Sequence, residues 1–361
     1  MKNKLIYWSI FSIAILLILV LALTVLFQQH PEDTHNDKQL RACLEPDEKQ
    51  KGVHYFSVTD TSDFPPLAKN NVEWITMVSW AFQNDFDSPK VSHGANSEHR
   101  IQHDSNWVER IQLARNRGFK VFFKPHLWIH NPSEGKWRHD VFPNNGEDWQ
   151  QWQASYRSFI LRYAKVAEAA QAEMYCIGVE FSRLTLEKPA FWECLIQDVR
   201  SVYSGKITYA ANWFEEYEKI TFWNQLDYIG VQAYFPLVKN GNPSVEEISK
   251  GWDPYLHTME SIHKKYNQKI IFTEMGYRST TTSAIKPWEW IENDTLCAVL
   301  YSAETQANCY EAFFKTVWDQ DWFAGVHIWQ LKSNYELNEK NKMDFMPQGK
   351  PAEAVIARGF E

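Results

Sequence analysis

The sequence lacks the patterns that several common classes of protein require. Its five cysteines contain no Cys-x-x-Cys pair, which argues against a zinc ribbon or a thioredoxin-type redox motif. Basic residues are also few, with 37 Lys and Arg against 45 Asp and Glu and a formal net charge of −8. A protein that binds nucleic acid through phosphate contacts would show the opposite balance. We therefore expect no nucleic-acid partner.

Candidate metal ligands and disulfides are equally sparse. His126 and His130 are four residues apart, but Pro125 makes a helix there a poor expectation, so we expect no metal site. No cofactor is implied either. Cys297 and Cys309 could form a disulfide outside the cytoplasm, whereas free buried thiols are an equal alternative that spacing does not decide.

Tryptophan, by contrast, is plentiful. The chain of 361 residues contains 17 Trp, together with 16 Tyr and 22 Phe. Trp is seldom fully buried, because its size and its ring N–H favour partly exposed positions. The number of Trp side chains is therefore hard to place in a core alone. We consider Trp80, Trp128 and Trp137 as candidates for a surface groove, with no sequence feature that separates them from core residues.

The longest apolar run lies at the N-terminus. Residues 5–27 carry no charge and follow Lys2 and Lys4. At about 1.5 Å per residue, this run is long enough to cross a hydrocarbon layer of about 30 Å. The two lysines favour the cytoplasmic side. We expect residues 1–27 to form a cytoplasmic stub and a single transmembrane helix, with the rest of the chain in the periplasm or at the cell surface.

Two other interpretations of this segment stay open. A cleaved signal peptide would give a secreted protein, although the run is long for one and Ala22-Leu23-Thr24 is a poor cleavage site. Residues 40–43 (LRAC) loosely resemble a lipoprotein cleavage box, but Arg41 does not suit it. Residues 28–51 are polar and carry both charges, which predicts a linker. Residues 52–361 have the composition of one folded domain.

Within that domain, short β-rich runs alternate with amphipathic helical patterns. The predicted strands are 53–58, 74–80, 120–124, 174–179, 206–211, 228–234, 269–273 and 325–329. The predicted helices are 106–117, 149–170, 188–203, 253–266 and 302–319. Eight strands with helical crossovers predict a (β/α)₈ barrel. An open doubly wound sheet is the alternative, but the glycine-rich phosphate turn typical of that fold is absent after the first run.

Two of the predicted strands end on a glutamate. The fourth runs into Glu180 and the seventh into Glu274. The active sites of (β/α)₈ barrels lie at the carboxyl ends of the strands, so these side chains should meet across the barrel mouth. Strand side chains alternate between faces, which predicts the inward residues below the two acids. The residues expected to face inward are Cys176, Gly178, Ile270 and Phe272.

Paired carboxylates of this kind suit glycoside hydrolysis. When they lie about 5 to 5.5 Å apart, one protonates the leaving oxygen and the other attacks the anomeric carbon, with retention of configuration. Each acid could instead be a structural rim residue paired with a Lys or Arg. Two acids on strands four and seven of a Trp-rich barrel favour catalysis over that alternative.

Four segments in order along the chain carry a family resemblance. They are FKPH at 123–126, IGVE at 177–180, DYIGVQAYFP at 227–236 and TEMGY at 273–277. The chain resembles glycoside hydrolase family 113, which is known for endo-β-1,4-mannanases, over most of residues 52–335. The resemblance implies that Glu180 is the acid/base and Glu274 the nucleophile. Many members of the wider clan carry Asn just before the acid/base, whereas this chain has Val179, and Asn212 is a candidate substitute.

Other residues near the strand ends are candidates for binding the sugar. The Tyr234 hydroxyl could hydrogen-bond the nucleophile and keep it ionised. Trp329 and Trp213 could each pack against the apolar face of a pyranose ring. Lys124 and His126 could hold sugar hydroxyls. The charged residues Glu215, Glu216, Glu218 and Lys219 are expected to form a solvated face.

Three functional hypotheses follow. The first is a membrane-tethered retaining hydrolase that cleaves β-1,4-mannosidic linkages of oligosaccharides or polysaccharides. The second changes only the substrate, to another β-glycan such as a glucan, xylan or galactan. The third is a non-catalytic glycan-binding barrel of the cell envelope, which would require neither Glu180 nor Glu274.

Overall fold

The computed structural model describes residues 48–361 except residues 57, 94–103 and 290–299. The expected membrane anchor, most of the expected linker, the LRAC segment and Cys297 lie outside the described residues. Within the described ranges no helix is long and apolar enough to cross a membrane. Cys176, Cys194 and Cys309 have free thiols.

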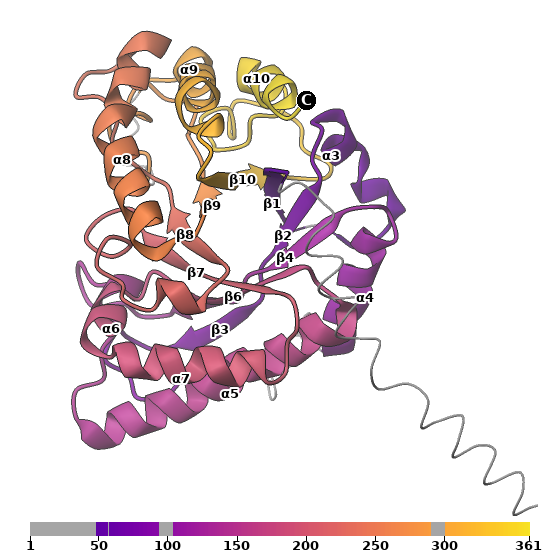
Figure 1. Ribbon diagram of the computed structural model, residues 1–361. Coiled ribbons are helices and arrows are strands. Elements are labelled where there is room, and N and C mark those ends of the chain that lie inside the picture. Colours follow the sequence, from indigo (N-terminus) through magenta and orange to yellow (C-terminus); the bar gives the residue numbers. More distant parts are fainter. Residues whose placement is uncertain (1–47, 57, 94–103, 290–299) are drawn as a thin grey trace, which may run out of the picture. The chain divides into compact units, whose positions relative to one another are not determined.

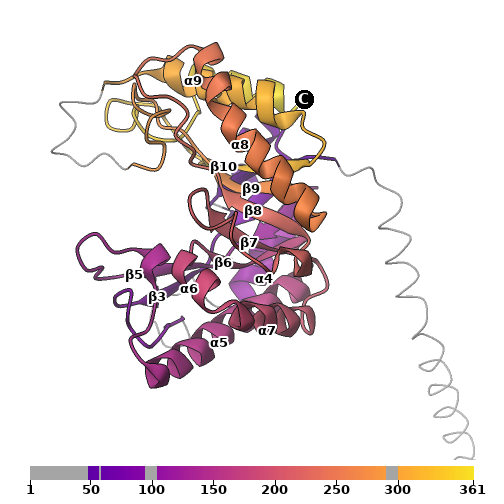
Figure 2. The ribbon, with the colours of Figure 1, turned by 60° about the vertical axis from the view of Figure 1, so that its left-hand side comes forward.

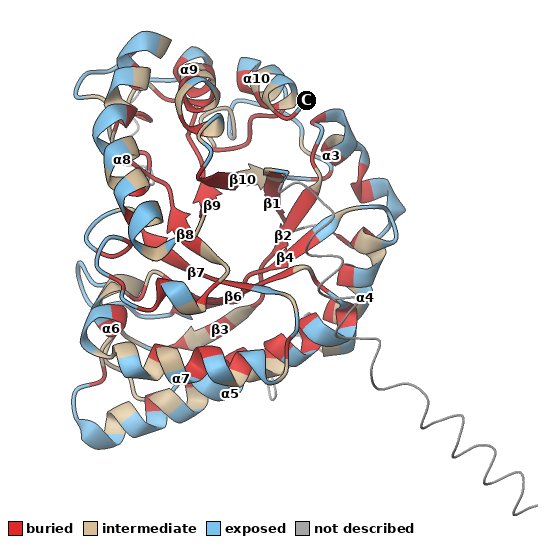
Figure 3. Ribbon diagram, in the orientation of Figure 1, coloured by how far each residue is buried: buried red, intermediate tan, exposed pale blue. Residues whose placement is uncertain are grey.

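Eight parallel strands close into a barrel, as predicted (Figure 1). Their order around the barrel is β1-β10-β9-β8-β7-β6-β4-β2. The strands are β1 (Gln50–Tyr55), β2 (Trp74–Met77), β4 (Lys120–Phe123), β6 (Met174–Val179), β7 (Lys206–Asn212), β8 (Tyr228–Gln232), β9 (Ile270–Met275) and β10 (Phe323–Leu331). Each strand is largely buried, because a strand of a closed parallel barrel is covered on both faces. Figure 3 shows this burial around the whole barrel wall.

Helices surround the barrel on the outside (Figures 1 and 2). They are α3 (Pro65–Lys69), α4 (Asp104–Arg115), α5 (Gly146–Ala170), α6 (Ser182–Glu187), α7 (Pro189–Arg200), α8 (Val245–Tyr266), α9 (Ala303–Phe313) and α10 (Pro351–Gly359). The longest, α5, begins where the Asn145 side chain accepts hydrogen bonds from two backbone N–H groups, and it ends at Gln171 in a left-handed conformation. Its apolar face packs against the barrel through Trp152, Tyr156 and Phe159.

The element boundaries differ from the predicted ones mainly at the ends. β1 begins at Gln50, inside the expected linker, because its backbone pairs with β10 there. The predicted helix 302–319 is α9 followed by a π-helical turn at Phe314–Trp318. The short α6 and the C-terminal α10 were not predicted.

A second, two-stranded parallel sheet lies beyond the barrel rim. It consists of β3 (Trp80–Gln83) and β5 (His126–Ile129), with Trp80 opposite His126. The predicted strand 74–80 therefore divides into β2 and the start of β3. Backbone bonds continue across the break, from Lys124 N–H to the Met77 carbonyl and from His126 N–H to the Ser79 carbonyl. This two-stranded sheet, called the β3–β5 ribbon below, is thus an extension of strands β2 and β4.

The predicted alternation is wrong on both strands that lead to the two glutamates, β6 and β9. Cys176 faces the barrel interior as expected, but Gly178 lies against Trp192 and Tyr209 of the surrounding layer. The register shifts between Cys176 and Val179, so the strand bulges and its last residues change face.

On β9 the residue that faces the interior is Ile271. Ile270 and Phe272 belong to the layer between the barrel and the helices, where Phe272 stacks on Trp252. Here the register shift occurs where Gln232 of β8 pairs with Glu274. Each acid therefore reaches the mouth by an irregularity at the strand end rather than by simple alternation.

Replacement of Gly178 by Ala should destabilise the fold. An added Cβ would lie 2.8 Å from ring atoms of Trp192 and Tyr209, which are held by a packed core. We expect the free energy of unfolding to fall by about 1–3 kcal/mol, the usual effect of overpacking, in a urea titration. Gly146→Ala is the matched control, because nothing lies within 4 Å of its Cβ position. Equal stabilities of the two variants would contradict the close approach.

Candidate active site

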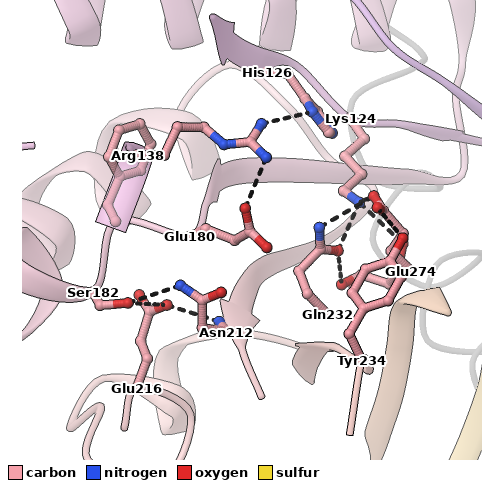
Figure 4. A network of polar contacts seen from close by, with 12 residues as sticks. Lys124, His126, Arg138, Glu180, Ser182, Asn212, Glu216, Gln232, Tyr234 and Glu274 are labelled. Carbon is pink, nitrogen blue, oxygen red and sulfur yellow. Dashed lines mark hydrogen bonds and ion pairs between the residues drawn. The ribbon is translucent and has the colours of Figure 1, made fainter. Parts of the chain in front are cut away.

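The candidate active site lies at the carboxyl ends of the barrel strands. Glu274 is on β9, and Glu180 directly follows β6. In Figure 4 the carboxylate of Glu180 points toward the side on which Glu274 lies. The charges of both carboxylates act on the Tyr234 hydroxyl. Burial first, then the charge and hydrogen bond of Glu274 and the charge of Glu180, raise the pKa of Tyr234 well above its usual value.

Glu274 is buried and held by four side chains. Its Oε1 accepts a hydrogen bond from the Tyr234 hydroxyl at 2.6 Å. Its Oε2 lies 2.9 Å from the Lys124 ammonium and 3.1 Å from the Gln232 amide nitrogen, and 3.5 Å from Nε2 of His54. The expected contact between Tyr234 and Glu274 is confirmed.

These contacts fix the charge of Glu274. Burial alone would raise the pKa of this carboxyl group, but the Lys124 and His54 partners and the Tyr234 hydrogen bond lower it to about 2. The carboxylate is therefore ionised at every ordinary working pH, as a nucleophile must be. Because the pKa is lower than in the unfolded chain, the group stabilises the fold above pH 4.5, and this contribution is lost as the pH falls toward about 2.

Glu180 has a different environment. Its backbone adopts a left-handed conformation with φ of 59°, which is uncommon for a residue with a side chain. Its backbone N–H donates to the Ala210 carbonyl at 2.9 Å. Nη2 of Arg138 donates to Oε2 at 2.7 Å, and Nη1 lies 3.2 Å from Nδ1 of His126. Within the described residues Oε1 accepts no hydrogen bond, so it is available to a ligand.

Lys124 occupies a different place from the one we expected. Its side chain is fully buried, and its ammonium contacts Glu274, Gln232, His54 and the Thr273 carbonyl. It therefore acts on the carboxylate below the mouth and has no free face for a sugar hydroxyl. His126 is also buried, between Arg138 and the Trp80 ring, and within the described chain its Nε2 has no partner.

The other predicted binding residues lie around the mouth. Asn212 ends β7, where its amide donates to the Ser182 hydroxyl at 2.9 Å. Trp213 is half-buried and stacks on the exposed Trp288, with ring centroids 5.2 Å apart. Trp329 is half-buried beside His54, and its ring N–H has no hydrogen-bond partner among the described residues. Their roles in binding a sugar stay predictions.

Three further Trp residues form one cluster on the ribbon beyond the rim. Trp128 packs edge-on against Trp80 at 5.8 Å and against Trp137 at 5.4 Å between ring centroids. Trp128 is 43% exposed. The cluster therefore offers an apolar aromatic surface to solvent near the side of Glu180.

Sequence reasoning missed several residues of the site. His54 and Gln232 are polar residues within apolar strands, a signal that could have found them. Arg138 begins a three-residue 3-10 helix in the connection between β5 and α5, and this connection gives no such signal. Glu216 was expected in a solvated face, and this is wrong, because its carboxylate is fully buried beneath Asn212. The described chain has no cluster of three or more His, Cys, Asp or Glu side chains that could hold a metal ion.

A barrel with two carboxylates of unlike environment at its mouth defines a glycoside hydrolase type of site. The model of Glycoside Hydrolase Family 113 matches residues 49–350. The chain belongs to this family, and the protein is a glycoside hydrolase of the β-mannanase-like type. None of the curated proteins matches the chain.

Solved structures of Family 113 enzymes are also similar to this chain. A Family 113 β-1,4-mannanase in a complex has a TM-score of 0.73 and 24% identity, over 87% of this chain and 99% of that chain. The β-mannanase AaManA from Alicyclobacillus acidocaldarius, in complex with ManMIm, has a TM-score of 0.72 and 26% identity, over 87% and 97%. A β-glucuronidase from Ruminococcus gnavus, at 14% identity and a TM-score of 0.57, covers 87% of this chain and 50% of its own, and shares the fold alone.

Removal of the Lys124 charge should strongly destabilise the protein at neutral pH. Lys124→Met leaves the buried Glu274 carboxylate without its ammonium partner, a loss that typically costs about 3–5 kcal/mol. Urea titrations at pH 7 measure it. The double variant Lys124→Met/Glu274→Gln should recover a large part of the loss, because no unpaired charge remains.

The control is an exposed ion pair. Lys264→Met removes a lysine that contacts Glu260 at the surface and should leave the stability nearly unchanged. If Lys124→Met and Lys264→Met behaved alike, the buried pair would not hold the site as described.

Proposed function

We propose that this protein is a retaining β-1,4-mannanase in which Glu274 is the nucleophile and Glu180 the acid/base. The observation that carries the proposal is the environment of Glu274. A buried carboxylate held ionised by Lys124 and Tyr234 is suited to attack and unsuited to donate a proton. The acid must then be its counterpart, Glu180, whose Oε2 is bound by Arg138 while its Oε1 has no hydrogen-bond partner among the described residues.

The first chemical step breaks the glycosidic bond. A Glu274 carboxylate oxygen attacks the anomeric carbon as the bond to the leaving oxygen breaks, and Glu180 gives its proton to that oxygen. The products are a covalent glycosyl ester on Glu274 and the released part of the sugar chain, which now carries a free hydroxyl group. Tyr234 and Lys124 both contact the nucleophile, and they hold its oxygens in one orientation throughout.

The second step hydrolyses the ester. Glu180 is now ionised and takes a proton from a water molecule, which attacks the same anomeric carbon. Glu274 departs as a carboxylate, and its return to the ion pair with Lys124 favours its departure. Two inversions give overall retention.

Aromatic and polar groups around the mouth would bind the sugar chain. Trp329 is half-buried beside His54, on the side of the nucleophile, so its ring suits packing against a pyranose ring. The Trp213–Trp288 stack and the Trp128 cluster offer further platforms. The preference for mannan is supported by the related solved structures, two of them of Family 113 β-1,4-mannanases and one of a β-mannanase in complex with ManMIm.

Two alternatives make different predictions. Hydrolysis of another β-glycan would keep the same two glutamates and change only the products from purified polysaccharides. A non-catalytic envelope protein would bind glycans without releasing reducing sugar. The cost of burying Glu274 beside Lys124 speaks against the second alternative, because binding alone needs no such pair. The uncharged run 5–27 supports our proposal that the protein acts outside the cytoplasm, anchored to the membrane.

The two glutamates can be distinguished kinetically. Glu274→Gln should abolish turnover of β-1,4-mannooligosaccharides. Glu180→Gln should lower kcat/KM for the same substrates by about 10² to 10⁴, the usual contribution of general acid catalysis. With a 2,4-dinitrophenyl β-mannobioside, which needs no protonation, Glu180→Gln should form the glycosyl-enzyme, and added azide should restore turnover.

The product of that rescue reports the stereochemistry. Retention predicts a β-glycosyl azide from Glu180→Gln and a β-configured first product from the wild type, both visible by proton NMR. An α-configured first product, or full activity of Glu274→Gln, would refute the mechanism. Circular dichroism of each variant checks that the fold is retained.

A further inference from the structure

A buried carboxylate outside the catalytic pair lies directly behind Glu180. Glu216 follows β7 in a short turn and has no exposed surface. Its Oε1 accepts hydrogen bonds from the Tyr209 hydroxyl at 2.6 Å and from the Thr185 hydroxyl at 2.9 Å. Its Oε2 accepts from the backbone N–H of Asn212 at 2.7 Å and from the Ser182 hydroxyl at 3.1 Å. Among the described residues it has no ion-pair partner.

The four donors come from the helix that follows the acid/base and from the strand that pairs with β6. Ser182 and Thr185 belong to α6, which begins two residues after Glu180. Tyr209 and Asn212 belong to β7. Figure 4 shows Glu216, Ser182 and Asn212 joined in one network below Glu180.

The same network holds the backbone directly after the catalytic position. The Tyr209 hydroxyl, while it donates to Glu216, accepts a hydrogen bond from the backbone N–H of Phe181 at 2.6 Å. The Ser182 hydroxyl accepts from the Asn212 amide. Glu180 itself has an uncommon left-handed backbone, which persists only where the surroundings determine it.

A buried carboxylate without a cation is unfavourable for the fold. Burial raises the pKa of Glu216 to about 7, against the hydrogen bonds from Tyr209, Asn212, Thr185 and Ser182, which lower it. Tyr209 is the one titratable side chain in contact with it among the described residues. A position that only fills space could hold a neutral amide or an apolar group equally well. Four converging hydrogen-bond donors, by contrast, require an acceptor with two oxygens.

We infer that Glu216 is a positioning residue for the reaction at Glu180, and that its carboxylate holds the turn after Glu180 and the Asn212 amide in one arrangement. The inference rests on the proposed function. It also gives Asn212 a defined orientation at the mouth, where its side-chain oxygen is not used by Ser182. Glu216 acts through these residues and does not contact the substrate.

The test compares two substrates that differ in their need for an acid. Glu216→Gln replaces one acceptor oxygen by a donor, so it should disturb the turn that carries Glu180. We expect kcat/KM for a β-1,4-mannooligosaccharide to fall by about 10-fold or more, and kcat/KM for a 2,4-dinitrophenyl β-mannobioside to stay within about 2-fold. Loss of folded protein alone would lower both equally. An equal loss, or no loss, overturns the inference.

Glu173→Gln is the matched control. Glu173 precedes β6, so the same chemical change falls at the opposite end of the strand that leads to Glu180, where Oε2 accepts from the Val121 N–H. It should leave the ratio of the two kcat/KM values unchanged. Ser182→Ala removes one donor and should shift the ratio in the same direction by less, which keeps the inference falsifiable if Glu216→Gln does not fold.

Stability measurements give a second, independent readout. A carboxyl group with a pKa near 7 in the fold and 4.5 in the unfolded chain binds more protons in the native state between these values. The wild-type free energy of unfolding should therefore contain a contribution that falls as the pH rises from about 4.5 to about 7. Glu216→Gln should remove that fall, and an unchanged pH dependence would contradict the buried carboxylate.

The proposed function and this inference fail in distinguishable ways. Wild-type protein that hydrolyses neither substrate refutes the proposed function, and the inference falls with it. Wild-type protein that is active on both, with a ratio that does not change in Glu216→Gln, refutes the inference alone.

Discussion

The ion pair of Lys124 and Glu274 is the constraint on which the site depends. Lys124 is fully buried and Glu274 nearly so, and each charge depends on the other at 2.9 Å. Lys124 directly follows β4, and Glu274 lies on β9, which does not neighbour β4 in the barrel. The pair therefore exists only when the barrel is closed, and Glu274 acquires its charge state as part of folding.

The two carboxylates proposed to be catalytic differ because different layers of the structure hold them. Glu274 is surrounded by side chains of the barrel itself, among them Tyr234 and Gln232. Glu180 lies at a turn whose neighbours are Arg138, from a loop, and the hydrogen-bonded group beneath it. One acid is thus kept in a single ionic form by buried partners, while the other has an oxygen open to a ligand. A double displacement needs this division of roles.

Much of the fold and part of the site could be predicted from the sequence. Apolar strands separated by amphipathic helices indicate a barrel, and an acid at the end of such a strand indicates its mouth, which located Glu180 and Glu274. Alternation failed at Gly178 and Phe272 because bulges depend on the neighbouring strand. Glu216 stands among charged residues that face solvent, and only the fold turns it inward. Arg138 gives no local signal, because a loop residue reaches the site through tertiary structure alone.

The ribbon of β3 and β5 joins the outer aromatic surface to the chain segments that carry the buried ion pair. The same two chain segments supply Lys124 at the floor and the Trp80–Trp128 surface at the wall, and continuous backbone bonds join the two parts. A shift of the Trp80–Trp128 surface therefore also moves the backbone that carries Lys124. Under the proposed function, a sugar chain bound to the outer aromatic surface would contact the same two chain segments that hold the Lys124 ammonium beside Glu274.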